Sequence, residues 1–342
     1  MIIVENISLA QYTTFKIGGK ARFFCIVSNI EELKEAVIFT KDKNIPLFIL
    51  GGGSNILISD EGFKGLVIKM ELRGIEIIED IHDVNKKSVL TAAGEIWDDF
   101  VKYTVDNGLY GLENLSLIPG TVGASPIQNI GAYGAEVKDV IQWVEVLEIA
   151  TGNISKLSNA ECRFSYRNSV FKELSNKFVV TRVAFRLNKD GEVDTDYKDV
   201  REYFEKKGIT SKPTIDQVRQ AIVDIRTAKL PDLEKWGTAG SFFKNPVITV
   251  EHFNELKIKY PELPSFPEPD GKVKVPLGYI IDKICGMRGY VNGKVASYDK
   301  QALVIVAGWG ASAKEVKDLA MELTAKIKEK TGIEVNNEVE FI

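Results

Sequence analysis

The chain is poor in cysteine and histidine. Only three of its 342 residues are cysteine and two are histidine. Cys25, Cys162 and Cys285 lie far apart, with no C-x-x-C pair, which argues against a disulfide framework and a zinc site. His82 and His252 stand in charged, loop-like contexts and are expected at the surface. We therefore expect no Ser-His-Asp triad and no metal site, and any acid–base chemistry must use other groups.

Long hydrophobic runs and an excess of basic charge are also missing. The formal net charge is −4 with no long basic run, so a nucleic-acid partner is not expected. No apolar stretch approaches the ~20 residues of a membrane span, and the first residues lack the pattern of a signal peptide. We expect a cytoplasmic protein without membrane insertion, and no obligatory protein partner is evident. The length exceeds the roughly 250–300 residues of one core, which indicates more than one domain.

Apolar periodicity outlines a mixed succession of strands and helices. Helical spacing and end signals predict helices at 29–43, 95–107, 214–227, 276–285 and 312–332. Short apolar runs predict strands at 22–28, 46–50, 56–58, 178–187, 301–307 and 338–342, a β-rich region at 66–94 and a hairpin over 143–157. The polar stretch 190–213 is typical of an insertion or linker.

The first of two Gly-rich stretches follows the predicted strand at 46–50. It consists of Gly51, Gly52, Gly53, Ser54 and Asn55. Consecutive glycines let the backbone approach a ligand and turn its N–H groups toward an anion. We interpret this stretch as a phosphate or pyrophosphate site. A simple strand turn is the alternative, although one or two glycines would suffice for that.

The second Gly-rich stretch covers residues 119–134. Its sixteen residues include four glycines, few charges, and several hydroxyls and amides. Such a lining suits close packing of the backbone on a large, flat, mostly uncharged ring system. A tightly packed internal crossover is the alternative.

Residues 308–313 match the pattern G-x-G-x-x-A between a predicted strand and helix, as a dinucleotide site would. No second parallel strand with a ribose-binding acid follows. Ser312 and Glu315 form a capping-box pattern that explains the turn locally. We therefore interpret this segment as a plain strand–helix connection.

Three polar clusters lie at 163–169, 237–246 and 336–340. The first places Arg163 and Arg167 among aromatics and hydroxyls, a combination suited to binding carboxylate or phosphate. Taken singly, each cluster is more often structural than catalytic.

Together these segments resemble the UDP-N-acetylenolpyruvoylglucosamine reductase family, flavin-dependent enzymes of bacterial peptidoglycan precursor synthesis. The matching segments occur in the family's order and cover nearly the whole chain: 13–19, 50–57, 112–134, 162–172, 226–231, 239–246 and 338–342. The resemblance implies an α+β protein with an FAD-binding fold of the vanillyl-alcohol-oxidase (PCMH) type and a C-terminal α/β substrate-binding domain. It implies FAD-binding subdomains at 1–70 and 71–213 and a substrate-binding domain at 214–334, with the strand at 335–342 returning near the site.

The implied reaction reduces UDP-N-acetylglucosamine enolpyruvate to UDP-N-acetylmuramate, with NADPH as co-substrate and FAD as cofactor. A flavin carries the hydride, so the protein supplies orientation, charge and a proton, and no histidine is required. By resemblance, Arg167 holds the enolpyruvyl carboxylate, Glu338 shares the developing charge, and Ser241 donates the proton. NADPH would use the same cleft before the sugar nucleotide, which removes the need for a Rossmann fingerprint.

The resemblance also implies the remaining contacts. The expected FAD-binding residues come from both Gly-rich stretches: Gly51, Gly52, Gly53, Ser54, Asn55, Ile56, Pro119, Gly120, Gly123, Ser125, Gln128, Asn129, Gly131, Ala132 and Tyr133. The residues expected to contact the UDP diphosphate and uridine are Tyr197, Lys229, Asn245 and Gln301. Tyr197 lies in the polar stretch 190–213, which indicates the longer of the family's two types.

Two other classes of function remain as alternatives. One is a different FAD enzyme of the same fold, such as an oxidase of an alcohol or sugar. The other is a flavin-binding or nucleotide-sugar-binding protein without turnover. The combination of Ser241, Arg167 and Glu338 favours the reductase, because an oxidase has no need of a proton donor placed for reduction.

Overall fold

The computed structural model describes residues 1–81, 83–268 and 271–342, so His82 lies outside the described residues. The chain forms two compact units, each built from three segments. Unit 1 consists of Met1–Ile7, Ala21–Gly52 and Lys64–Ala228, and unit 2 of Ser8–Lys20, Gly53–Phe63 and Lys229–Ile342. Each unit has a hydrophobic core of its own. The boundaries expected at 70/71 and 213/214 remain predictions. They separate parts of the chain by what each part binds, whereas the two units are defined by compactness alone.

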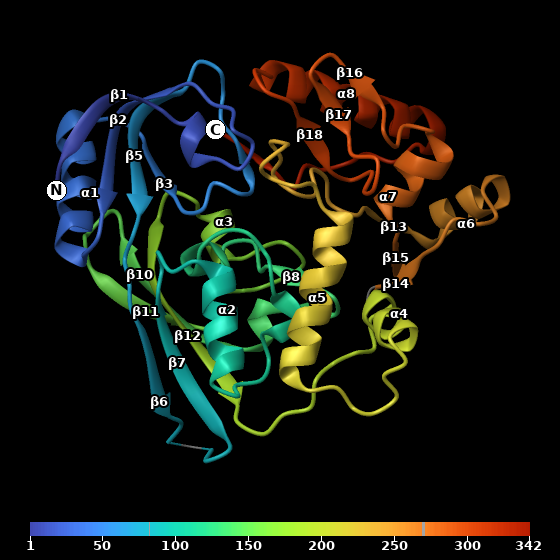
Figure 1. The fold of residues 1–342 in the computed structure, drawn as a ribbon. Coiled ribbons are helices and arrows are strands. Elements are labelled where there is room, and N and C mark those ends of the chain that lie inside the picture. Colours follow the sequence, from blue (N-terminus) through green and yellow to red (C-terminus); the bar gives the residue numbers. More distant parts are fainter. Residues whose placement is uncertain (82, 269–270) are drawn as a thin grey trace. The chain divides into compact units, whose positions relative to one another are not determined.

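The first layer of unit 1 is a four-stranded sheet with one helix beside it (Figure 1). In spatial order its strands are β1 (Ile3–Ser8), β2 (Lys20–Val27), β5 (Phe63–Met70) and β3 (Leu47–Leu50), with β3 parallel to β5. The helix is α1 (Ile30–Lys43), and its predicted inner face is confirmed, since Leu33, Ala36, Val37 and Thr40 are buried. The Asn29 side chain accepts a hydrogen bond from Glu32 N and so begins the helix where the sequence indicated.

The second layer of unit 1 is a five-stranded antiparallel sheet. Its spatial order is β11 (Ile154–Ser158), β10 (Ile141–Glu148), β12 (Phe178–Asn188), β7 (Lys86–Ala92) and β6 (Ile75–Glu79). The predicted hairpin is confirmed, with Trp143 opposite Ser158. Helix α2 (Trp97–Asp106) buries the face expected from its periodicity, including Trp97 and Phe100. The rings of Phe100 and Phe185 lie 4.8 Å apart, which joins this helix to β12.

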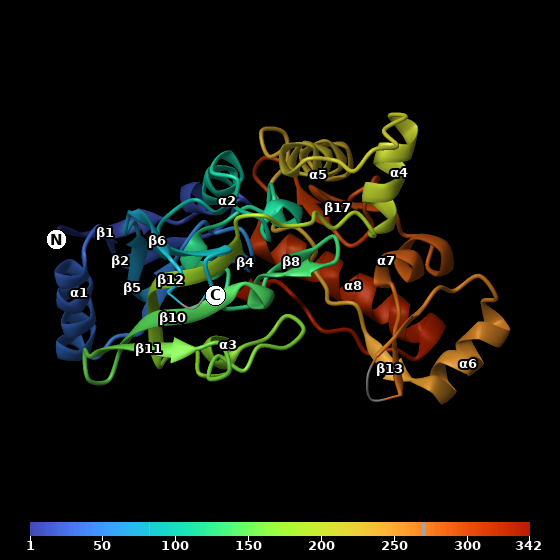
Figure 2. The same cartoon turned by 90° about the horizontal axis from the view of Figure 1, so that it is seen from below.

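Helix α5 (Ile215–Lys229) belongs to unit 1 for nearly all its length and lies beside α2 in both views (Figures 1 and 2). Its predicted capping box is confirmed, because Thr214 and Gln217 each accept a hydrogen bond from the other's backbone N–H. The stretch 190–213 is more than a linker. It contains helix α4 (Lys198–Lys206), whose buried Val200 and Phe204 pack on α5. Two apolar residues in a short, highly polar segment were too weak a signal for a sequence-based helix assignment.

The core of unit 2 lies between helix α8 (Ala313–Thr331) and an antiparallel sheet of β16 (Val291–Asn292), β17 (Val295–Ser297) and β18 (Ile305–Ala307). The predicted helix at 276–285 is confirmed as α7 (Leu277–Tyr279) continued by a π-helix over Ile280–Ile284. A second sheet has the spatial order β13 (Val247–Thr249), β15 (Lys272–Lys274) and β14 (Phe266–Pro267). Helix α6 (Val250–Lys259) directly follows β13 in the chain and contacts β13 and β15.

His252 corrects the expectation of a loop-like surface histidine. It lies in α6, is half-buried, and its Nε2 is 2.8 Å from the carbonyl oxygen of Thr331 at the end of α8. The ring therefore links two helices of unit 2. Neighbouring charges in the sequence, which suggested exposure, lie on other faces of this short helix.

The last strand of the chain returns to a segment near its beginning. Strand β19 (Glu340–Phe341) pairs in parallel with β4 (Ile56–Leu57), and both belong to unit 2. The remaining elements are short. They are β8 (Gly131–Ala132), β9 (Ala135–Glu136), helix α3 (Val170–Glu173) and the 3₁₀ turns Ala10–Tyr12, Glu113–Leu115, Val122–Ala124 and Val137–Asp139. Among the described residues, no helix has both the length and the apolarity to span a membrane.

Candidate active site

The two Gly-rich stretches touch each other in unit 1. A β-carbon built on Gly52 would lie 2.6 Å from Gly120 Cα, and one on Gly51 would lie 2.7 Å from Thr121 Oγ1. The Gly120 carbonyl also accepts a hydrogen bond from Trp97 N at the start of α2. These glycines therefore have a packing role, as the crossover alternative required. The same contact leaves two stretches of backbone side by side without side chains between them.

A half-buried lysine lies beside the first Gly-rich stretch. Lys69 stands opposite Leu50 in the β3–β5 pair, and its Nζ donates a 2.6 Å hydrogen bond to the Gly51 carbonyl. Burial lowers the pKa of this amine. Lys69 is not among the residues expected from the sequence, although a lysine within the apolar strand β5 was an available signal.

The middle of the second stretch is held by Asn129, which is fully buried with φ +48°. Its Nδ2 donates to Glu136 Oε2 and to the Ser165 carbonyl, both at 3.1 Å, and its Oδ1 accepts from Lys138 N at 3.1 Å. The side chain thus serves the loop itself.

Arg167, expected to be catalytic, contacts this same stretch. Its Nη2 donates to the Gly131 carbonyl at 2.8 Å, and its Nη1 to the Asn129 carbonyl at 3.4 Å. Arg167 itself has φ +51°, an uncommon backbone conformation for a residue with a side chain. A β-carbon at Gly131 would lie 3.2 Å from Arg167 Nη1, so glycine leaves room for the guanidinium.

Tyr133 ends the second stretch, and its ring meets that of Tyr197. The ring centroids are 5.3 Å apart in an edge-to-face arrangement. Tyr197 immediately precedes α4 and is 45% exposed, while burial raises the pKa of both phenols. The structure thus brings one expected FAD-binding residue and one expected substrate-binding residue together within unit 1.

In unit 2, chain segments that carry the family-like motifs converge around Thr14. Its N–H donates to the Gly53 carbonyl at 3.0 Å, and its Oγ1 donates to the Thr238 carbonyl at 2.6 Å. Gly237 has no room for a side chain, since a β-carbon there would lie 2.0 Å from the Phe15 carbonyl oxygen. The segments at 13–19, 53–57 and 237–246 are therefore parts of one structure.

Ser241 and Glu338, both expected to be catalytic, lie on neighbouring hydrogen-bonded segments of unit 2. The Glu338 N–H donates a 2.9 Å hydrogen bond to the carbonyl of Phe242, the residue directly after Ser241. Asn55 Nδ2 donates to the Glu338 carbonyl at 3.1 Å, and Glu340 N donates to the Asn55 carbonyl at 3.0 Å. Ser241 and Glu338 are both partly exposed. Arg167, the third expected catalytic residue, belongs to unit 1.

Two of the expected substrate-binding residues meet at the start of α7. Asn245 Oδ1 accepts a 3.0 Å hydrogen bond from Leu277 N. The next residue is Gly278, where a β-carbon would lie 3.2 Å from Gln301 Oε1. Lys229 is the last residue of α5 and opens the long C-terminal segment of unit 2.

The other expected FAD-binding residues differ in their exposure. Gly53 has φ +64° and no room for a side chain, Gly123 packs against Ala93, and Ser125 is buried with its Oγ donating to the Val122 carbonyl. Ile56 is buried in β4. The partly exposed or exposed members are Ser54, Pro119, Gln128 and Ala132.

The start of α8 supports reading 308–313 as a plain connection. The Asp60 carboxylate accepts hydrogen bonds from Ala313 N at 2.8 Å and Lys314 N at 3.0 Å. This helix N-terminus, where a dinucleotide would place its pyrophosphate, is therefore already used by a side chain. The predicted capping box of Ser312 and Glu315 is also present.

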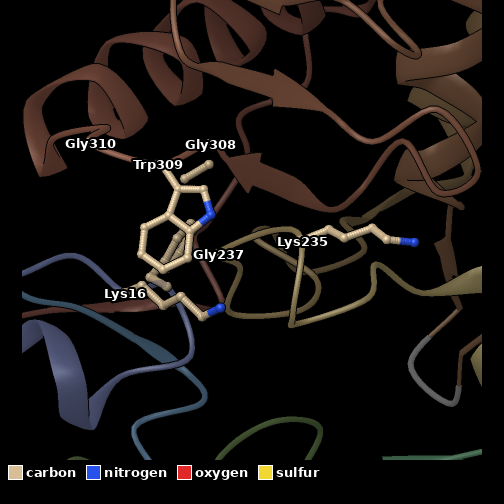
Figure 3. A pocket seen from close by; sticks show the side chains of 8 residues that line it. Lys16, Lys235, Gly237, Gly308, Trp309 and Gly310 are labelled. Carbon is tan, nitrogen blue, oxygen red and sulfur yellow. The ribbon is translucent and has the colours of Figure 1, made fainter.

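A small hollow in unit 2 lies next to this connection (Figure 3). Lys16 Nζ lies 5.1 Å from the centre of the Trp309 ring and donates to the Leu233 carbonyl, so its ammonium is already engaged within the protein. Figure 3 shows Lys235 pointing away from the indole. Within the described ranges, no group of three or more His, Cys, Asp or Glu side chains is placed to hold a metal ion.

Comparison with known families assigns a class to these two units. A model of an FAD binding domain matches residues 21–158, and a model of the C-terminal domain of UDP-N-acetylenolpyruvoylglucosamine reductase matches residues 231–342. The expected order of domains is confirmed: an FAD-binding domain precedes a C-terminal domain of the reductase type, and both combine helices with sheets. The chain is thus a flavin-dependent oxidoreductase by class.

Full-length relatives then define the family. The UDP-N-acetylenolpyruvoylglucosamine reductase of Chromobacterium violaceum is 43% identical over 335 residues, covering 97% of each chain. That of Flavobacterium johnsoniae is 41% identical over 344 residues, covering both chains completely. The crystal structure of the Thermus caldophilus reductase covers 99% of each chain with a TM-score of 0.69 and 24% identity, and so supports the fold. The chain belongs to the UDP-N-acetylenolpyruvoylglucosamine reductase family.

Proposed function

We propose that this enzyme reduces the enolpyruvyl group of UDP-N-acetylglucosamine enolpyruvate to give UDP-N-acetylmuramate, using NADPH and FAD. This reaction serves peptidoglycan precursor synthesis in the bacterial cytoplasm. The observation that carries the proposal is the hydrogen bond from Glu338 N to the carbonyl of Phe242, the residue after Ser241, inside the unit that contains the reductase-type domain. Full-length similarity to reductases of that name supports the choice of substrate.

The reaction adds a hydride to the terminal carbon of the enol ether and a proton to the neighbouring carbon. The hydride pushes an electron pair toward the carboxylate, so negative charge develops there as an enolate. A fixed positive charge stabilises that transition state more than the ground state. Arg167 would hold the carboxylate, and its hydrogen bonds to the Gly131 and Asn129 carbonyls fix the orientation of its guanidinium.

Ser241 would deliver the proton. A hydroxyl is a weak acid, so the transfer needs a geometry that is set before the substrate arrives. The hydrogen bond from Glu338 N to the Phe242 carbonyl, and the pairing of Ser241 with Val304, fix the backbone on both sides of the hydroxyl. Glu338 would share the charge as the proton leaves.

The residues of the two Gly-rich stretches fit FAD. The contact of Gly52 with Gly120 leaves two stretches of backbone without side chains between them, as close approach to a pyrophosphate or a flat ring requires. Asn129 and Ser125 are buried, and their side chains are engaged within the protein, so they would shape the stretch that holds the cofactor. When bound there, FAD would supply the hydride chemistry that links NADPH oxidation to reduction of the substrate.

The UDP portion would contact Tyr197, Lys229, Asn245 and Gln301. Asn245 uses its Oδ1 for Leu277 N, so its amide NH₂ is the group that would face a ligand. The Tyr197 ring contacts the Tyr133 ring in an edge-to-face arrangement, and the Tyr197 hydroxyl is the group that would contact a ligand.

The two half-reactions separate the proposed role of Ser241 from a structural one. In stopped-flow measurements on purified holoenzyme, Ser241→Ala should leave flavin reduction by NADPH unchanged. It should slow flavin reoxidation by the enolpyruvyl substrate by about 10²–10⁴-fold, as expected for loss of a general acid. Ser155→Ala, an exposed serine on β11, serves as the control and should change neither step.

Three results would contradict the proposal in different ways. Wild-type protein without flavin absorbance would exclude a flavoenzyme. A reduced flavin that reacts with oxygen but not with the enolpyruvyl substrate would favour an oxidase. Unchanged half-reactions in Ser241→Ala would remove Ser241 as the proton donor while leaving the substrate assignment intact.

A further inference from the structure

Leu117 has an unusual backbone conformation directly before the second Gly-rich stretch. Its φ is +58°, in the left-handed region that residues with a β-carbon rarely adopt. Ile118 and Pro119 follow it, and Pro119 opens the stretch. The direction in which the chain enters the stretch therefore depends on a residue that would relax to another conformation if nothing held it.

Both peptide groups of Leu117 are held by charged side chains from two helices. Asp98 in the first turn of α2 accepts a hydrogen bond from Leu117 N through Oδ1 at 2.5 Å. Arg226 in α5 donates from Nε to the Leu117 carbonyl at 3.2 Å. Hydrogen bonds to ionised groups are stronger than those between neutral groups, so together these contacts can offset the strain at Leu117.

Asp98 is itself held in place. Arg219 donates from Nη1 to Asp98 Oδ1 at 2.8 Å and from Nη2 to Oδ2 at 3.0 Å, a bidentate pair. Arg219 and Arg226 are two helical turns apart and share one face of α5. Burial acts to raise the pKa of Asp98, but the hydrogen bonds from Arg219 and Leu117 outweigh it, so the pKa lies below its usual value.

Arg226 also reaches the far end of the stretch. Its guanidinium forms a hydrogen bond with the side chain of Tyr133, and burial lowers the pKa of this guanidinium. One arginine thus contacts Leu117 before the stretch and Tyr133 at its end. The guanidinium of Arg167 contacts Asn129 and Gly131 between these points.

We propose that Asp98 is a positioning residue for the flavin site. With Arg219 and Arg226 it holds Leu117 in the left-handed conformation and presets the second Gly-rich stretch. The inference rests on the proposed function, because it assumes that this stretch binds FAD. Asp98 acts through Leu117 and need not touch the flavin or the substrate.

A pair of substitutions tests the route through Leu117. Asp98→Ala should weaken FAD binding about tenfold, the factor that corresponds to the usual cost of left-handed backbone. Asp98→Asn keeps a hydrogen-bond acceptor for Leu117 N and should therefore lose less FAD affinity than Asp98→Ala. Leu117→Gly placed in the Asp98→Ala protein should restore most of the affinity, because glycine adopts this conformation without that cost.

Asp99→Ala is the matched control, since Asp99 is exposed in the same helical turn and should leave the affinity unchanged. Dissociation constants come from titration of apoprotein with FAD, followed by flavin fluorescence. A second measurement is amide hydrogen exchange over residues 117–134 of the apoprotein. Exchange should be faster in Asp98→Ala than in wild type or Asp99→Ala, whether or not the protein binds a flavin.

The outcomes are distinct for the two proposals. Wild-type protein that does not bind FAD would overturn the proposed function. Wild-type affinity and unchanged exchange in Asp98→Ala would overturn the positioning role. If the double variant bound FAD no better than Asp98→Ala, the loss would come from damage to α2 and not from Leu117, and the inference would also fall.

Discussion

The contact between Gly52 and Gly120 leads to a prediction that is steric in origin. Gly52 does not have positive φ, so alanine is compatible with its backbone and the only new feature of Gly52→Ala is one methyl group. That methyl would lie 2.6 Å from Gly120 Cα and 3.1 Å from Gly120 C. Carbon atoms pack at about 3.5–4.0 Å, so the two stretches must separate by roughly 1 Å.

The expected effect follows from this displacement. Forcing an extra methyl group into a packed site costs about 1–3 kcal/mol, so the free energy of unfolding should fall by that amount. FAD affinity should fall by at least about tenfold, because both backbones that would contact the cofactor move apart. Urea denaturation of the apoprotein measures the first quantity, and titration with FAD measures the second.

Gly308→Ala is the matched control. Gly308 also lacks positive φ, and its β-carbon would lie 3.4 Å from the Lys294 carbonyl oxygen and 3.9 Å from Trp236 Cζ3, which are ordinary contacts. Gly308→Ala should change the free energy of unfolding by no more than about 0.5 kcal/mol. If Gly52→Ala bound FAD as wild type does and unfolded like the control, the closeness of the two stretches would have no consequence, and the reasoning would be refuted.

Three further predictions concern stability. Asp60→Ala should lower the free energy of unfolding by about 1 kcal/mol in urea denaturation, because α8 loses its N-terminal acceptor, whereas the neighbouring Glu61→Ala should have a smaller effect. The folded pKa of Asp98 is below its unfolded value of about 3.9, so its contribution is present above that pH and disappears as the pH falls through the folded pKa. Asp98→Asn should therefore lose less stability than wild type between about pH 5 and pH 3. Lys16→Met should lower the free energy of unfolding by about 0.5–1 kcal/mol, because the contact with the Trp309 ring is lost. An unchanged midpoint of urea denaturation would contradict this prediction.

The long helices could be predicted because their signals are local. In α1 and α5 the apolar residues recur at helical spacing, and a cap residue marks the beginning of each helix. Helix α4 was not predicted, because its local signal is weak. Val200 and Phe204 form only one turn of apolar surface, and their burial depends on α5, which lies farther along the chain. Tertiary packing stabilises such a helix more than its own sequence does.

The expected catalytic pair could be chosen by resemblance but not brought together by sequence reasoning. Ser241 lies next to Phe242, whose carbonyl accepts a hydrogen bond from Glu338 N, and Asn55 donates to the Glu338 carbonyl from a third part of the chain. These contacts bring together residues that are far apart in the sequence. Apolar alternation indicates that a strand exists and says nothing about which strand pairs with it. The match of motifs in order therefore predicted the residues, while their pairing had to come from the structure.

The glycines and Leu117 show a deeper difference in what a sequence can reveal. Where the backbone approaches another backbone, glycine is required, so Gly52 carries a visible signal. At Leu117 the left-handed conformation is stabilised from outside, by Asp98 and Arg226 on two helices. A leucine followed by isoleucine and proline reads as ordinary apolar chain. Strain that distant charges hold in place leaves no local pattern, so residues with this kind of role must be found from hydrogen bonds in the folded protein.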